Sequence, residues 1–281
     1  MYNAEYTRKF YNAYAGAEWQ RLEATPYGRL QHIIHEDILK KYLEPGNRVL
    51  DAGAGPGRFS IVAAKAGAKV TVLDISDKQL EIARQKIDES GQLNNIEQFI
   101  RGDICDLSVF KDEQFDIVVC FGGALSYVCE KRQKAADELV RVTKPGRIIL
   151  VSAVSRLGPA IGEAQIPDVP NLKNPDGNAD LPGIWPVLEN GILHNIPSRA
   201  AGMLHSPMYL YTAKELVGIF KGHRILETAA SNAAIREFAA VNAQLAADPA
   251  VWATVVEMEK RINHEPGLVD IGSHIILAVR K

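Results

Sequence analysis

The residues with the clearest potential for chemistry lie in one stretch, VLDAGAGPGR, at positions 49–58. Two apolar residues lead to an acid, and three glycines then alternate with other residues before a segment of apolar periodicity. This order predicts a buried strand that stops at Asp51, a tight turn, and a helix that begins near Gly57. Glycine permits positive φ and leaves no Cβ between backbone and ligand, and a helix start presents unpaired N–H groups. The turn therefore suits a nucleotide-like ligand at the carboxyl end of a parallel sheet.

Two kinds of nucleotide compete for such a turn. The dinucleotide fingerprint is G-x-G-x-x-G, with the pyrophosphate on the helix N-terminus. Here the glycines are Gly53, Gly55 and Gly57, and Asp51 precedes them. A carboxylate in that place would repel a pyrophosphate, whereas it would tolerate a ligand that carries a sulfonium or an ammonium group.

The pattern D-x-G-x-G-x-G after a strand resembles the first motif of class I S-adenosylmethionine (SAM) dependent methyltransferases. The resemblance implies SAM as cofactor and S-adenosylhomocysteine as product. It also implies that Asp51, Ala52, Gly53 and Gly55 lie at the cofactor.

A second acid, Asp74, ends the next predicted strand, VTVLD at 70–74. A carboxylate there can accept two hydrogen bonds from vicinal ribose hydroxyls, which is a strong, charge-assisted arrangement. NAD enzymes share this feature, so Asp74 indicates a ribose without identifying the cofactor. We place Ile75, which follows Asp74, in the same site.

A third acid follows the third predicted strand, in Gly102-Asp103-Ile104. Asp103 could accept a hydrogen bond from the exocyclic amine of adenine, and Ile104 could pack on the ring. An acid has that role in the methyltransferase family, although Asp is also common in turns and helix caps. FDIVVCFG at 115–122 looks like the fourth strand of the family, and we place Phe121, in the loop after it, at the cofactor.

The rest of the chain alternates strands and helices, which implies right-handed βαβ units and a parallel sheet. The strands are expected at 48–50, 70–74, 96–100, 115–120, 148–151, 224–226 and 272–279, and the helices at 30–42, 59–66, 78–89, 135–142, 212–220, 233–247 and 250–262. The resemblance covers about residues 28–155 and the closing strands. It implies a doubly wound, mostly parallel seven-stranded sheet in which the last strand is antiparallel.

The N-terminal segment, residues 1–27, is rich in aromatic and charged residues and ends at Pro26, which breaks it. It is either an amphipathic helix that packs on the core or a lid over the cofactor, as in many proteins that resemble this one. Our candidates here are Tyr11, Trp19 and Arg29. The Arg29 guanidinium offers two parallel donors for the methionine carboxylate, although a solvated residue at a helix start is the alternative.

Residues 155–205 interrupt the alternation and are rich in Pro and Gly. A loop of that length inside a compact domain is uncommon and usually functional, so we interpret it as an insertion over the carboxyl edge of the sheet, with an interdomain linker as the alternative. The expected organisation is a single methyltransferase domain, residues 1–281, with an N-terminal helical lid at 1–45, a cofactor-binding core at 46–154, the insertion after strand five at 155–205, and C-terminal strands and helices at 206–281.

The composition favours a globular protein. The chain has 281 residues, a formal net charge of −2 and 47% hydrophobic residues. No apolar run approaches the roughly 18 residues that a membrane span needs, and the first residues lack the pattern of a signal peptide, so a cytoplasmic location is expected. The absence of a long basic run argues against a nucleic-acid partner. We therefore expect a small-molecule acceptor and leave the oligomeric state open.

The acceptor and the catalytic residues are less well defined. Phe121-Gly122-Gly123-Ala124 replaces the Asn-Pro-Pro-Tyr type of motif, which argues against adenine N6 or a glutamine amide as acceptor. No metal-binding pattern is evident. Tyr127, His194 and His205 are candidate general bases, although a packing or surface role is the simpler interpretation of each.

The three cysteines allow one further interpretation of the acceptor site. They fall near the predicted carboxyl edge of the sheet and have no zinc-like spacing. A soft or arsenic acceptor is conceivable for them, but buried small hydrophobic residues are the simpler interpretation. These cysteines are Cys105, Cys120 and Cys129.

The sequence thus predicts an enzyme that transfers a methyl group from SAM to a small molecule, with the acceptor atom (O, N, S or C) open. Two other classes remain: a SAM-binding regulatory protein without turnover, and an NAD-linked oxidoreductase in which Asp74 has the same role.

Overall fold

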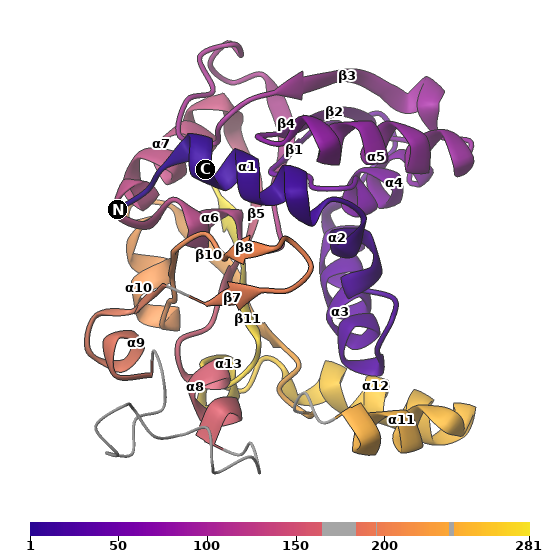
Figure 1. Cartoon of the computed structure of the whole chain (residues 1–281). Helices are drawn as coiled ribbons and strands as arrows, with labels where there is room; N and C mark the ends of the chain where they lie inside the picture. Colours follow the sequence, from indigo (N-terminus) through magenta and orange to yellow (C-terminus); the bar gives the residue numbers. More distant parts are fainter. Residues whose placement is uncertain (165–183, 195, 236–238) are drawn as a thin grey trace.

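A computed structural model describes residues 1–164, 184–194, 196–235 and 239–281. Its centre is a seven-stranded sheet with the strand order β10-β11-β5-β4-β1-β2-β3 (Figure 1). Its strands are β1 (Arg48–Ala52), β2 (Lys69–Asp74), β3 (Ile96–Arg101), β4 (Phe115–Cys120), β5 (Thr143–Val154), β10 (Arg224–Ser231) and β11 (His274–Arg280). Only β11 runs against its neighbours in this sheet. The predicted fold class is therefore confirmed.

The two faces of the sheet are covered by different helices. Val49 and Leu50 are adjacent in β1, and because side chains alternate along a strand they belong to two separate hydrophobic clusters. The Val49 face packs against α3 (Pro26–Tyr42), α4 (Arg58–Lys65), α5 (Asp77–Glu89) and α12 (Pro249–Ile262). The Leu50 face packs against α6 (Ala124–Tyr127), α7 (Arg132–Val142) and α10 (Ala213–Gly218).

The register of the central strands brings the candidate residues together. Asp51 in β1 lies opposite Val72 in β2 and Val119 in β4, and all three strands run parallel. The loops that leave β1, β2 and β4 therefore emerge at one edge of the sheet, where open α/β folds bind their ligands.

The N-terminal segment forms α1 (Ala4–Tyr14) and α2 (Gly16–Arg21), joined at Ala15, whose φ is 37°. In Figure 1 the indigo α1 lies across the molecule, and it contacts α5. The N-terminal helices end before Pro26, as expected, but Pro26 itself begins α3, four residues before the predicted helix start at Leu30. Proline suits the first helical position, and the Thr25 hydroxyl caps the helix by accepting from the Gly28 N–H at 3.0 Å.

Residues 155–205 contain more regular structure than their composition indicates. The described part includes α8 (Leu157–Ala164), α9 (Ile184–Asn190), β6 (Ile192–Leu193), β7 (Pro197–Ser198) and β8 (Met203–Leu204). β7 pairs with β8, and β6 pairs with β9 (Met208–Tyr209). The remainder of the predicted insertion, residues 165–183 and 195, lies outside the described residues.

The C-terminal region departs from the predicted helix at 233–247. Its described helix, α11 (Ala239–Ala247), begins later, and residues 236–238 lie outside the described residues. Ala233 and Ala234 donate their N–H groups to the Glu259 carboxylate, at 2.9 and 2.7 Å, and lie outside a helix. The other described short helices are α13 (Pro266–Val269) and the 3-10 turns η1 (Leu93–Asn95) and η2 (Cys129–Lys131). None of the helices in the described part of the chain has the length and apolar character to cross a membrane.

Candidate functional site

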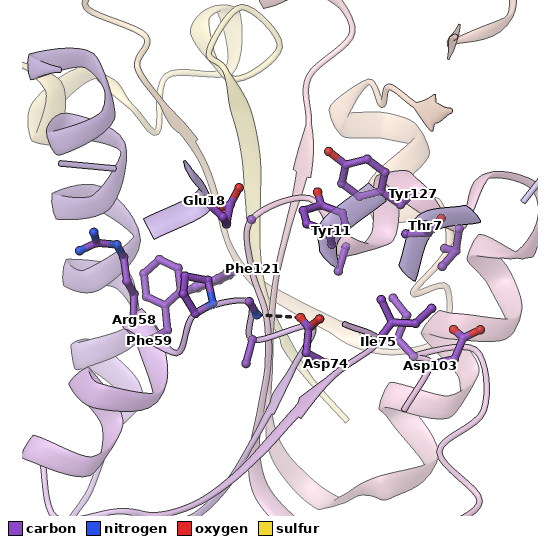
Figure 2. Close-up of a pocket in the computed structure, with 18 of the residues that line it drawn as sticks. Thr7, Tyr11, Glu18, Arg58, Phe59, Asp74, Ile75, Asp103, Phe121 and Tyr127 are labelled. Atoms are coloured by element: carbon purple, nitrogen blue, oxygen red, sulfur yellow. Dashed lines mark hydrogen bonds between the residues drawn. The ribbon is translucent and has the colours of Figure 1, made fainter. Parts of the chain in front are cut away.

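A cavity opens at the carboxyl edge of the sheet, and Figure 2 shows many of the side chains that line it. Its floor comes from the loops after β1, β2, β3 and β4, and its cover comes from the N-terminal helices. We call residues 53–57 the glycine loop. We call α1, α2 and residues 204–206, which contact α1, the roof.

The glycine loop has the backbone that its sequence predicts. Gly53, Gly55 and Gly57 have φ values of +78°, +53° and +82°, a region that side chains with a Cβ rarely occupy. The N–H groups of Gly53 and Ala54 donate to the Leu73 carbonyl at 2.8 and 2.9 Å, so the loop folds back over the end of β2. Gly53 and Gly55 line the cavity.

Asp74 connects β2 to the glycine loop. Its two carboxylate oxygens accept hydrogen bonds from the N–H groups of Ser76 and Gly55, each at 2.8 Å, and the second is drawn in Figure 2. Burial raises the pKa of Asp74 to about 6, even though both hydrogen bonds favour the charged form. Asp74 and Ile75 line the cavity.

Asp103 has the turn role that the sequence offered as one alternative, and it also holds the N-terminal segment. One of its oxygens accepts from the Cys105 N–H at 2.8 Å, which is a turn interaction, and the other accepts from the Tyr2 hydroxyl at 2.8 Å. Asp103 and Ile104 also line the cavity. The N-terminus is thereby attached to the same carboxylate that the resemblance assigns to adenine.

Asp51 and Ala52 do not line the cavity, because β1 continues through both residues. Asp51 is 2% exposed and accepts a hydrogen bond from the Ser60 hydroxyl at 2.6 Å. Burial raises the pKa of Asp51 to about 7. The acid of the motif therefore lies beneath the loop and connects β1 to α4.

Two other candidates, Trp19 and Arg29, also lie away from the cavity wall. Arg29 is 5.7 Å from the ring centre of Trp252 and donates to the Glu23 carbonyl at 3.4 Å. Trp19 packs its ring against the Arg58 guanidinium at 3.8 Å. Trp19 lies away from the cavity because of helix geometry, since residues three or four positions apart on a helix share a face and adjacent residues do not.

Glu18 and Arg21 take the place expected for Trp19 and Arg29. They are three residues apart on α2, line the cavity and form a bidentate ion pair with its shortest distance at 2.7 Å. Their side chains are 16% and 31% exposed. Arg21 also donates to the Gln31 side chain at 3.2 Å. The spacing E-x-x-R was visible in the sequence, but nothing in it indicated which face of α2 is turned inward.

The three candidate bases differ in their position relative to the cavity. Tyr127 lines the cavity, and its hydroxyl is 3.5 Å from Nε2 of His205. His194 is exposed and does not line the cavity. Tyr11 and Phe121 line the cavity as expected. Figure 2 shows the hydroxyls of Tyr11 and Tyr127 on the same side of the pocket.

The cysteines are buried small residues. None of them lines the cavity, and burial raises the pKa of the Cys105 thiol to about 12 and that of Cys120 further. A protonated thiol is a weak nucleophile. Among the described residues, no group of three or more His, Cys, Asp or Glu side chains has the arrangement of a metal site.

Several contacts hold the roof in place. Arg8 pairs with Asp77 at 2.8 Å, the Ser76 hydroxyl donates to the Asn12 side chain at 2.6 Å, and both contacts join α1 to the start of α5. On the other side, the Tyr6 hydroxyl donates to the Leu204 carbonyl at 2.7 Å, and the Thr7 and Ser206 hydroxyls are 2.8 Å apart. The roof therefore spans elements that are distant in sequence.

Comparisons with known proteins bear on the family and the fold of the chain. The profile of a family described as "Methyltransferase domain" matches residues 49–146. A demethylmenaquinone methyltransferase from Clavibacter sepedonicus is 39% identical over 111 residues, which are 39% of this chain and 42% of the relative. A malonyl-[acyl-carrier protein] O-methyltransferase from Serratia marcescens is 35% identical over 111 residues, 40% of each chain. The match thus spans about two fifths of the length of these curated relatives.

Solved structures resemble a larger part of the chain. A SAM-dependent methyltransferase from Methanosarcina mazei gives a TM-score of 0.56 at 19% identity, covering 87% of this chain and 96% of its own. The [4+2]-cyclase SpnF gives a TM-score of 0.52 at 22% identity, covering 88% of this chain and 79% of its own. At this level of identity the likeness concerns the fold. Residues 49–146 thus match a methyltransferase-domain profile, and the sheet has the order and the antiparallel last strand that the resemblance to class I SAM-dependent methyltransferases implies.

Proposed function

We propose that this protein is a methyltransferase that moves a methyl group from SAM to a small-molecule acceptor. The observation that carries the proposal is the contact between the Gly55 N–H and the Asp74 carboxylate, which joins the glycine loop to a ribose-binding acid inside one cavity. A family match over residues 49–146 supports it.

Several residues of the cavity have the chemistry that binding of SAM requires. A Cβ added to Gly53 would lie 2.7 Å from the Ala124 Cβ. The backbone at position 53 can therefore pack this closely against Ala124 only because the residue is glycine. Asp74 would hold the ribose, and Asp103 with Ile104 would hold the adenine.

The amino acid end of the cofactor matches the ion pair of α2. That end is a zwitterion, and we assign its carboxylate to Arg21 and its ammonium to Glu18. Glu18 lies next to the glycine loop, because a Cβ added to Gly55 would be 3.8 Å from its Cγ. Arg21 thus replaces Arg29 in the role that the sequence predicted.

The cofactor supplies a methyl group on a sulfonium, and the protein supplies binding and orientation. The roof covers this part of the cavity, and a site that is closed to water strengthens the electrostatic interactions inside it. The wall near the roof is largely aromatic, with Tyr11, Phe59, Phe121 and Tyr127. This lining supports a small, partly apolar acceptor.

Two alternatives share the same fold. A SAM-binding protein without methyl transfer remains an alternative, since a fold by itself does not define a function and one structural neighbour is described as a cyclase. An NAD-linked oxidoreductase is disfavoured because Glu18 would add a carboxylate beside the glycine loop, where a pyrophosphate would lie.

Calorimetry with SAM, S-adenosylhomocysteine and NAD tests the cofactor. We expect the first two to bind and NAD not to bind. Asp74→Ala and Asp103→Ala should each weaken SAM binding at least tenfold, because a hydrogen bond to a charged group contributes about 1.5–3 kcal/mol. Asp88→Ala, an exposed acid on α5, is the matched control. Equal affinity in all three variants would contradict the assignment.

Methyl transfer is tested by measuring S-adenosylhomocysteine formation over a panel of small hydroxyl, amine, thiol and activated-carbon acceptors. Tight SAM binding without turnover on any acceptor would favour the regulatory alternative.

A further inference from the structure

Three polar side chains lie close together where the roof meets the cavity. Tyr11 comes from α1, Tyr127 from α6, and His205 from the segment that follows β8. The His205 ring lies between Phe10, at a centroid distance of 4.3 Å, and Tyr127, at 5.6 Å with a 19° angle between the planes. Tyr127 lines the cavity, whereas His205 does not, and the Tyr127 hydroxyl is 3.5 Å from Nε2 of His205.

The hydrogen bonds of His205 define its tautomer. Its Nδ1 is 3.1 Å from the Ser206 carbonyl oxygen, which can only accept, so Nδ1 carries the hydrogen and donates it. Nε2 is then left with its lone pair, 3.5 Å from the Tyr127 hydroxyl. Burial lowers the pKa of His205, so the ring is neutral near pH 7 and available as a base.

The environment of Tyr127 keeps its hydroxyl protonated, because burial raises the pKa of this group. The nearby Tyr11 hydroxyl and Arg21 guanidinium lower the same pKa. Burial and the Glu18 carboxylate oppose them, and the pKa of Tyr127 stays above its ordinary value. Tyr127 is therefore protonated at rest and suited to pass a proton on rather than to store negative charge.

We propose that Tyr127 and His205 form a proton relay for an acceptor that is methylated on a weakly acidic hydroxyl group, either aromatic or enolic. This inference rests on the proposed methyltransferase function and adds a substrate class and two roles to it. Tyr127 is the catalytic residue that touches the acceptor, and His205 is a positioning residue that acts through it.

The proton balance of the relay is complete. The acceptor O–H bond breaks, and its proton moves to Oη of Tyr127 while the proton of Tyr127 moves to Nε2 of His205. The acceptor oxygen uses its electron pair to form the new C–O bond, and the pair of the broken C–S⁺ bond stays on sulfur. His205 ends as an imidazolium, which returns its proton to solvent through Tyr127 after the products leave.

The relay explains why a hydroxyl is the favoured acceptor. A phenol or enol holds its proton at neutral pH and becomes a strong nucleophile only when the proton is removed, and a general base contributes about 10²–10⁴-fold to such a step. A thiol needs little assistance because part of it is ionised. An aromatic or enolic acceptor also fits the rings of Tyr11 and Phe121 in the same wall.

The first test needs no turnover. Nitrogen NMR of ¹⁵N-histidine-labelled protein, with and without saturating S-adenosylhomocysteine, reports the tautomer of His205. We expect a protonated Nδ1, an unprotonated Nε2, and a shift of the Nε2 resonance in Tyr127→Phe. A hydrogen on Nε2, or an Nε2 resonance that Tyr127→Phe leaves unchanged, would overturn the relay.

The second test measures kinetics on the panel of acceptors. Tyr127→Phe and His205→Gln should lower kcat for an un-ionised phenol or enol about 100-fold or more, with the Kd for SAM within about twofold of the unchanged protein. His194→Gln, an exposed histidine outside the cavity, should have no effect. A nitrophenol that is already ionised at the assay pH should be methylated by both variants near the original rate.

The outcomes separate the relay from the broader function. If SAM binds and only thiol or amine acceptors are methylated, or if both variants keep the original rate on phenols, the relay is wrong and the methyltransferase proposal stands. If the ionised acceptor is not rescued, the two side chains have a structural role and the relay is again wrong. Failure of SAM to bind would instead contradict the proposed function.

Discussion

The glycine loop and the roof enclose the same cavity but are built in different ways. The loop spans five consecutive residues, and its geometry depends on backbone angles and on two N–H groups that donate to one carbonyl. The roof combines two helices with residues 204–206, and side-chain contacts such as Tyr6 with Leu204 and Thr7 with Ser206 hold it together.

This difference separates two kinds of binding site. Backbone geometry is dictated by local sequence, so the loop should tolerate almost no change of its glycines and should recognise one cofactor. Side-chain contacts can be replaced one at a time, so we expect the contacts between α1 and residues 204–206 to vary without loss of the fold. Functional residues on such connecting segments, held by a rigid scaffold, are the common arrangement in enzymes.

The largest effect is expected in the loop. Gly55→Val places a branched side chain at a φ of +53° and beside Glu18. We expect SAM affinity to fall about 100-fold, because strain of this kind costs about 1–3 kcal/mol. The new side chain would also enter the cavity. Gly46→Val, at a φ of +82° with open space around it, has similar strain away from the site. Calorimetry should show a loss of SAM affinity only for Gly55→Val. Equal SAM affinities in the two variants would show that the backbone conformation of the glycine loop does not control cofactor binding.

The next effect distinguishes two arginines of the N-terminal region. Arg21→Met removes a cation from the cavity wall, and we expect at least a tenfold loss of SAM affinity, since charged hydrogen bonds contribute about 1.5–3 kcal/mol. Arg29→Met, which alters a contact with Trp252, should bind SAM within about twofold of the unchanged protein. The opposite pattern in a binding titration would restore Arg29 and remove Arg21 from the site.

A smaller effect should appear in the pH dependence of stability. The pKa of Asp51 is about 7 in the folded protein against an ordinary 3.8, so the folded state binds more protons between these values. Stability from this group is therefore complete below about pH 4 and is lost as pH rises through 7. We expect the unfolding free energy of the unchanged protein, relative to Asp51→Asn, to fall by at least about 1.4 kcal/mol, equivalent to one pKa unit, between pH 4 and 7. Urea unfolding at several pH values measures it, and a difference that is flat or rises with pH would contradict the burial of this carboxylate.

The smallest effect concerns one attachment of the roof. Arg8→Ala removes the partly exposed ion pair with Asp77, and exposed pairs of this kind contribute little to stability. We expect the thermal midpoint to change little and SAM affinity to fall by less than about fivefold. Lys9→Ala, next to it on α1 and more exposed, is the control. A complete loss of binding in Arg8→Ala would mean that single side chains hold the roof closed, unlike the distributed attachment seen here.

The sequence predicted the part of the site that depends on strand ends. Gly53, Gly55, Asp74, Ile75 and Asp103 all line the cavity as expected, because parallel strands bring their carboxyl ends to one edge of the sheet. The prediction that Asp51 lies at the cofactor is not supported by its position, because the strand continues past Asp51 and its carboxylate accepts a hydrogen bond from Ser60.

For the roof, the sequence predicted which segment of the chain is involved but not which of its residues line the cavity. It indicated that residues 1–27 cover the cofactor and named Tyr11, which lines the cavity, but also Trp19 and Arg29, which do not. The inward face of α2 depends on how the chain turns at Ala15 and on the elements that α2 meets, and a helix of six residues carries too little periodicity to show it.

What the sequence determined by itself is the order of the strands along the chain, the two apolar faces of the sheet and the glycine loop, because each depends on residues that are neighbours in the chain. Only the tertiary structure decided that Glu18 and Arg21 face the cavity, and that Tyr127 meets His205, 78 residues away. Contacts of that kind form when elements from distant parts of the chain pack together, and the local pattern of either element has no information about its partner.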